Sequence, residues 1–105
     1  MPGRPYPSVI TGPGVTRQVL ADSPELMIVA NDFAAGARGA LHRHPHVQAT
    51  FVQSGHFAFT VAGETFEVGP GDCFVVPSNA EHGCQALTDG RLIDSFTPRR
   101  DDFLV

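Results

Sequence analysis

The sequence contains no lysine and no tryptophan, and it has one tyrosine and two cysteines in 105 residues. Without lysine, covalent chemistry through a lysine Schiff base is excluded. Cys73 and Cys84 are too few for a disulfide framework, so a reducing cytoplasm is the expected compartment. No G-x-S-x-G nucleophile elbow, dinucleotide-binding glycine fingerprint or phosphate-binding loop occurs. Histidine, carboxylate, glutamine, arginine and thiol groups are what remains for catalysis.

Basic residues and long apolar runs are also scarce. The basic residues are seven scattered arginines, and the net charge is -4, so no nucleic-acid partner is expected. No apolar run approaches the roughly 20 residues that span a membrane, and the N-terminus lacks the apolar stretch of a signal peptide. The length and the hydrophobic fraction of 42% predict one soluble globular domain.

Glycine and proline divide the chain into short segments of strand character. Residues 1–14, rich in both, predict an extended arm or an edge strand. Hairpin turns are indicated at Ala62-Gly63 and Asp89-Gly90, whereas residues 99–105 have room for one helical turn. The pattern predicts an all-β sandwich or barrel. The expected strands cover residues 15–20, 26–30, 47–52, 57–61, 64–68, 73–76, 82–87 and 91–96.

Histidines occupy alternate positions at His42, His44 and His46, and Gln48 follows them. Alternate residues of a strand project from the same face. Neighbouring imidazoles, joined by another imidazole from a distant strand, form a pocket suited to a divalent metal. His82, beyond two Gly/Pro turns, is the candidate for that distant ligand.

The spacing of these residues resembles the two motifs of the cupin superfamily, G-x5-H-x-H-x3-E-x6-G and G-x5-P-x-G-x2-H-x3-N. Residues 36–55 match the first motif and residues 71–86 match the second. The departures are Gln48 for the family Glu, Asn79 for Gly and Ala86 for the final Asn. Asn79 is a mild departure, because asparagine tolerates left-handed backbone better than most residues.

The resemblance implies a single cupin domain over residues 15–105, folded as a double-stranded β-helix (a jelly-roll barrel), and a homodimer. It also implies one divalent transition metal (Zn, Ni, Fe, Mn or Co) bound by His42, His44, Gln48 and His82. With Gln48 in place of Glu, the ligands are all neutral and the metal keeps its full charge. We infer that this favours polarisation of a substrate oxygen over oxygen activation.

The segment from Asp94 to Phe103 resembles the ending of small single-domain cupins, including the pectin-degradation cupins, which convert 4,5-unsaturated monouronates to open-chain keto sugars. The resemblance implies that Asp94 and Phe96 lie near the substrate. Arg100 is a candidate for a substrate carboxylate, with a salt bridge between tail and body as the alternative. One departure is Val47, where such sequences usually carry Glu.

Strand alternation gives further candidates. Asp94 shares a face with Leu92 and Phe96, so its side chain is expected to point inward. It is a candidate general acid or base, and the alternatives are a cap of the Asp89-Gly90 turn or a salt bridge with an arginine. His46 is a candidate for the pocket mouth or its rim. Cys84 is a pocket candidate or a small buried hydrophobe, and His56 is expected on the outer surface.

Together these patterns predict a metal-dependent enzyme acting on a small oxygenated acid. Lewis-acid isomerisation, ring opening or lyase chemistry is expected, with Asp94 carrying the proton. Two alternatives stay open, an iron- or manganese-dependent dioxygenase and a non-catalytic cupin that binds a small ligand.

Overall fold

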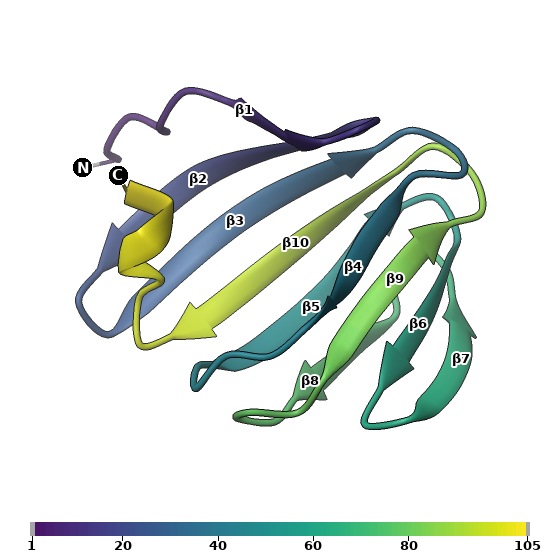
Figure 1. Cartoon of the computed structure of the whole chain (residues 1–105). Helices are drawn as coiled ribbons and strands as arrows, with labels where there is room; N and C mark the ends of the chain where they lie inside the picture. Colours follow the sequence, from purple (N-terminus) through teal and green to yellow (C-terminus); the bar gives the residue numbers. More distant parts are fainter. Residues whose placement is uncertain (1, 105) are drawn as a thin grey trace.

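The computed structural model describes residues 2–104, and ten strands and one short 3-10 helix lie within this range (Figure 1). No helix in this part of the chain has the length and hydropathy to span a bilayer. The elements are β1 (Val9–Gly12), β2 (Val15–Ser23), β3 (Leu26–Phe33), β4 (Arg38–His42), β5 (Val47–Ser54), β6 (Phe57–Val61), β7 (Glu64–Val68), β8 (Cys73–Val76), β9 (His82–Ala86), β10 (Gly90–Thr97) and η1 (Asp101–Leu104).

The all-β prediction is confirmed, and most expected strands lie where alternation placed them. The N-terminal segment contains β1, which forms the edge of a sheet, and the tail forms the single turn η1. The main differences from expectation concern three strands. Strand β4 was not predicted, β2 continues three residues beyond Leu20, and β3 continues three residues beyond Ala30. In the added part of β3, Asn31 and Phe33 share the inner face and the exposed Asp32 lies on the outer face.

Two antiparallel sheets build the jelly roll. In the described residues, the larger sheet has the order β1-β2-β3-β10-β5-β8 and the smaller sheet has the order β4-β9-β6-β7. Figure 1 shows the smaller sheet in front of the β5 and β8 side of the larger one. The β4–β5 and β8–β9 connections are two of those at which the chain crosses between the sheets, so residues near them come together although they belong to different sheets.

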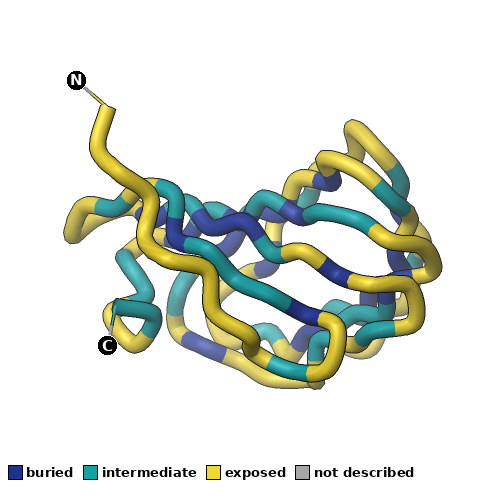
Figure 2. The backbone as a smooth tube through the Cα atoms, turned by 90° about the horizontal axis from the view of Figure 1, so that it is seen from above, coloured by how far each residue is buried: buried dark blue, intermediate teal, exposed yellow. Residues whose placement is uncertain are grey.

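Hydrophobic side chains fill the space between the sheets in two clusters. The first contains Phe33 and Phe57, whose rings meet edge to face with centroids 5.4 Å apart. The second consists of Val19, Met27, Val29 and Phe96, and η1 covers it with Phe103 and Leu104. Fully burying such a side chain contributes roughly 1.5–3 kcal/mol. Figure 2 shows the buried segments within the strands and the exposed N-terminal segment along the outside.

Alternation in β5 and β10 places polar groups inside the barrel. Gln48, Thr50 and Val52 are no more than 6% exposed, whereas the intervening Phe51 is 41% exposed. On β10, Asp94 is 5% exposed between the buried Leu92 and Phe96. Asp94 therefore faces the interior, as the alternation predicted.

Turn geometry agrees with the sequence signals. Ala62 and Gly63 both have positive φ angles, 50° and 84°, as a two-residue hairpin with a type I′ turn requires. Asn79, which replaces the family glycine, has a φ of 61°. At Gly55, which ends the first motif, φ is 79° and an added Cβ would lie 2.3 Å from the Asp89 carbonyl oxygen.

Gly55→Ala is expected to lower the free energy of unfolding by roughly 3 kcal/mol, through backbone strain and a clash with backbone. Gly63→Ala is the matched control, because Gly63 has a similar positive φ but no atom within 4 Å of an added Cβ. It should cost about 1 kcal/mol. Urea unfolding of both variants measures the difference, and equal losses would contradict the role of the close approach.

Candidate metal centre

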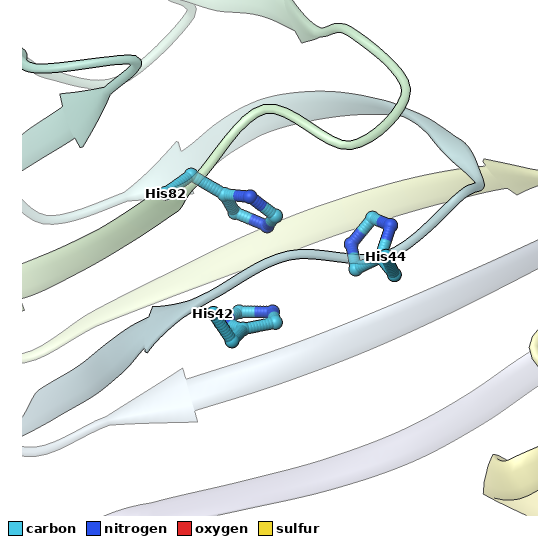
Figure 3. Close-up of side chains that lie close together, drawn as sticks. All are labelled: His42, His44 and His82. Atoms are coloured by element: carbon cyan, nitrogen blue, oxygen red, sulfur yellow. The ribbon is translucent and has the colours of Figure 1, made fainter.

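Three histidines, from the end of β4, the loop after it and the start of β9, converge at one end of the barrel (Figure 3). His42 ends β4 and His82 begins β9, and the two are register partners in the smaller sheet. One ring nitrogen from each of His42, His44 and His82 lies within 4.8 Å of the others. The strand rationale for His44 was wrong, because β4 ends at His42 and His44 reaches the cluster from the loop before β5.

A backbone carbonyl oxygen lies beside Nδ1 of each of the three histidine rings. The Nδ1 atoms of His42, His44 and His82 lie 2.8, 3.2 and 2.9 Å from the carbonyl oxygens of Ala40, His46 and Ala80. A carbonyl oxygen only accepts, so these contacts favour the proton on Nδ1 in the neutral rings of His42 and His82, with a lone pair on Nε2. In His44 both ring nitrogens face an accepting oxygen, the His46 carbonyl at Nδ1 and Gln48 Oε1 at Nε2, so one ring proton serves only one of the two contacts. His82 Nε2 is buried with no hydrogen-bond partner among the described residues. Ring nitrogens with unshared lone pairs in a buried position fit a bound cation.

Burial keeps two of these rings neutral. It lowers the pKa of His44 to about 4, with the positive charge of Arg100 as the next cause. It also lowers the pKa of His82. At neutral pH both rings are uncharged, so an added proton does not compete with a metal for these two ligands.

Gln48 points its amide oxygen at the histidines. Its Nε2 donates to Thr50 Oγ1 at 3.0 Å and to Asp94 Oδ1 at 3.3 Å, which leaves Oε1 3.1 Å from His44 Nε2. With the His44 proton on Nδ1, where the His46 carbonyl accepts it, two lone pairs face each other across this distance. A cation held between them would turn a repulsion into two favourable contacts. The set of three imidazoles and one amide oxygen therefore fits a divalent metal.

The buried carboxylate of Asp94 accepts the hydrogen bonds that position Gln48. It accepts hydrogen bonds from Thr50 Oγ1 at 2.6 Å, Asn31 Nδ2 at 2.7 Å and Gln48 Nε2 at 3.3 Å. Burial raises the pKa of the Asp94 carboxyl, and the three donors oppose that shift. These donors, rather than a turn backbone or an arginine, are its partners. A glutamate at position 48 would place a second carboxylate against Asp94, which explains why this chain departs from the motif there.

A cavity of about 500 Å³ adjoins the centre. Of the residues predicted to form the site, it is lined by His42, Gln48, His82, Asp94, Phe96 and Arg100. Cys84 also lines it, but burial raises the pKa of its thiol to about 12, so it is not a thiolate at neutral pH.

Two of the predicted site residues, His46 and Arg100, make contacts that differ from those of the histidine cluster. The His46 ring packs against those of His44 and Phe96, with centroids 5.4 and 6.5 Å apart, and it does not line the cavity. Arg100 donates through Nε and Nη2 to both carboxylate oxygens of Asp102, at 3.0 and 2.9 Å. Its salt bridge is thus within the tail, while its side chain still lines the cavity.

Sequence reasoning missed three polar residues that face the interior. Asn31 and Thr50 bind Asp94, and Arg17 lines the cavity. Alternation carried a signal for two of them. Thr50 shares the parity of Gln48 and Val52, and Arg17 lies between the buried Val15 and Val19.

Comparison with known proteins agrees with the fold and the motifs. A family model described as "Cupin domain" matches residues 31–95. The chain is 39% identical over 95 residues to the pectin degradation protein KdgF of Dickeya dadantii (strain 3937), covering 89% of this chain and 86% of that protein. The chain therefore belongs to the cupin family, and it resembles the pectin-degradation cupins.

Solved structures give the same result. KdgF from Halomonas sp. is 40% identical, with a TM-score of 0.89 and coverage of 93% of this chain and 91% of that one. An RmlC-like cupin from Shewanella frigidimarina NCIMB 400 is also 40% identical, with a TM-score of 0.89 and coverage of 92% and 87%.

Replacing His82 with Ala is expected to lower the affinity for Zn²⁺ or Ni²⁺ by at least about 100-fold, since losing an outer hydrogen-bond partner already costs 10- to 100-fold. His56→Ala is the matched control, because His56 is exposed and outside the cluster. Equilibrium dialysis with elemental analysis measures both variants. Similar affinities for the two would contradict the centre.

Gln48→Glu is expected to bind metal more tightly but to destabilise the metal-free protein by about 1–3 kcal/mol at pH 8, through the lost hydrogen bond and the facing carboxylates. The pair shares a proton with a raised pKa, so the loss should shrink as the pH falls toward 5. Gln53→Glu, on the exposed face of β5, adds the same charge away from Asp94. Urea unfolding at both pH values should separate the two variants, and parallel curves would exclude the Gln48–Asp94 coupling.

Proposed function

We propose that this chain is a metal-dependent enzyme that opens the ring of a small unsaturated sugar acid by Lewis-acid isomerisation. The observation that carries the proposal is the direct contact between Gln48, beside the three histidines, and the buried Asp94 in the wall of one cavity. The identity to a protein named for pectin degradation supports uronates as the substrate class.

In this proposal His42, His44 and His82 hold the metal through Nε2, and Gln48 holds it through Oε1. When bound, a divalent metal there supplies a Lewis acid that polarises a substrate oxygen. The four protein ligands are neutral, so the negative charge in this part of the site belongs to Asp94, which is held apart for proton transfer.

Asp94 carries the proton in the proposed reaction. Opening a 4,5-unsaturated uronate breaks the bond between C1 and the ring oxygen. It forms a carbonyl at C1 and moves the anomeric hydroxyl proton to C4, so that C5 becomes a ketone. One carboxylate that accepts and then returns a proton balances this step, and no oxidant is needed. Asp94 Oδ1 has two donors and Oδ2 has one among the described residues, which leaves a lone pair free on Oδ2.

The other predicted residues have binding and supporting roles. Phe96 and Arg100 line the cavity, and we propose that the Phe96 ring packs against the substrate while Arg100 adds positive charge for its carboxylate. His46 supports the centre through its carbonyl oxygen, which accepts from His44 Nδ1.

A homodimer and a cytoplasmic location stay predictions. The outer face of the larger sheet carries exposed apolar residues that suit a dimer, among them Val47, Phe51 and Val75 at 39%, 41% and 61% exposure.

Asp94→Asn is expected to retain the metal but to lower turnover by about 10² or more, because the amide cannot accept and return a proton. Elemental analysis of protein purified without chelators measures the metal. Proton NMR of 4,5-unsaturated galacturonate, with an oxygen electrode in parallel, measures the reaction.

The outcomes separate the candidate functions. Normal turnover by Asp94→Asn would exclude the proton-transfer role. Oxygen uptake matching product formation would replace isomerisation with dioxygenase chemistry. Binding of the uronate without conversion by the metal-loaded wild type would indicate a ligand-binding cupin.

A further inference from the structure

An arginine occupies a core position on the inner face of the larger sheet. Arg17 lies on β2 between Val15 and Val19, which are 7% and 3% exposed, and its side chain lines the same cavity as His42 and Asp94. A charged side chain between two buried residues of a strand lowers the stability of the fold unless the charge is paired or binds a ligand. Nothing in the proposed metal centre uses this side chain.

The guanidinium of Arg17 is held in place but its donors are free. Its Cζ lies 3.8 Å from the centroid of the Phe103 ring, a stacking contact that orients the planar group. Among residues 2–104 it makes no ion pair and no side-chain hydrogen bond, whereas Arg100, 4.2 Å from the same ring, is engaged by Asp102. Partial burial lowers the pKa of Arg17, yet an arginine stays protonated at neutral pH.

Arg17 lies on the same inner sheet face as Asp94, two strands away. It is the register partner of Asn31 on β3, and Asn31 donates to Asp94 on β10, the next strand of the sheet. Adjacent strands are about 4.8 Å apart, so the β2 and β10 backbones are separated by about 10 Å. A cation with free donors and a carboxylate therefore line one cavity of about 500 Å³ at this separation, an arrangement that suits a small ring with an anionic end.

We propose that Arg17 binds the carboxylate of the substrate and sets the preference of the cavity for sugar acids over neutral sugars. This assignment rests on the proposed function. The fork of N–H donors in a guanidinium suits a planar carboxylate in two parallel hydrogen bonds. Arg100, paired with Asp102, then contributes charge and shape rather than the principal contact.

The test compares D-galacturonate with D-galactose, which share a ring but differ in the carboxylate. Metal-loaded wild type, Arg17→Met and Arg17→Lys are titrated with each sugar by calorimetry, and turnover of 4,5-unsaturated galacturonate is followed by NMR. Arg17→Met should lower galacturonate affinity and kcat/KM by roughly 10- to 100-fold and leave galactose binding unchanged. Arg17→Lys keeps the charge but not the fork, and an intermediate loss is expected.

The control is Arg4→Met, which removes one positive charge from an exposed position outside the cavity. It should leave the affinity for both sugars unchanged. A general disturbance of the fold would weaken both sugars together, so the ratio of the two affinities isolates the carboxylate contact. If the wild type is active but the ratio of galacturonate to galactose affinity is unchanged in Arg17→Met and Arg17→Lys, the role of Arg17 is overturned and the proposed function stands. Failure of the wild type to bind or convert any uronate would instead overturn the proposed function.

Discussion

The hydrogen bonds around the buried Asp94 carboxylate are the interaction on which the site depends. A carboxylate that is 5% exposed is costly unless donors surround it, and Thr50, Asn31 and Gln48 supply them. Because Thr50 gives its proton to Asp94, its oxygen can only accept from Gln48. The amide of Gln48 is thereby fixed with its oxygen toward the histidines. One buried charge thus orients a ligand of the candidate metal centre.

Sheet topology makes these contacts possible. Strand β10 lies between β3 and β5, so a residue on β10 has neighbours from both strands. The histidines come instead from the smaller sheet and from the loop that crosses to β5. The candidate centre therefore joins the two sheets, with the histidines on one side and the Asp94 hydrogen-bond network on the other. Residues of both groups line the same cavity, and in the proposed reaction this arrangement leaves Asp94 available for proton transfer.

The departure from the cupin motif at position 48 and the carboxylate at position 94 are two parts of one arrangement. A glutamate would offer the metal a charge, but it would face Asp94 without a donor between them. Glutamine satisfies Asp94 through its nitrogen and offers the histidine cluster its oxygen. The proposed neutral ligand set, inferred from the motif as a bias toward Lewis-acid chemistry, thus agrees with the hydrogen bond from Gln48 to the neighbouring carboxylate.

The sequence by itself determined the all-β class, most strand positions and the inward direction of Asp94, because glycine and proline mark turns and alternation is a local property of the strand backbone. Motif spacing also indicated His42, His44, Gln48 and His82 as a group. Only the tertiary structure decided how His44 reaches the cluster, that Asn31 and Thr50 hold Asp94, and that Arg17 has free donors in the cavity. Asn31 and Asp94 are 63 residues apart. Their contact depends on the register between β3 and β10, and no local pattern in either strand contains that register.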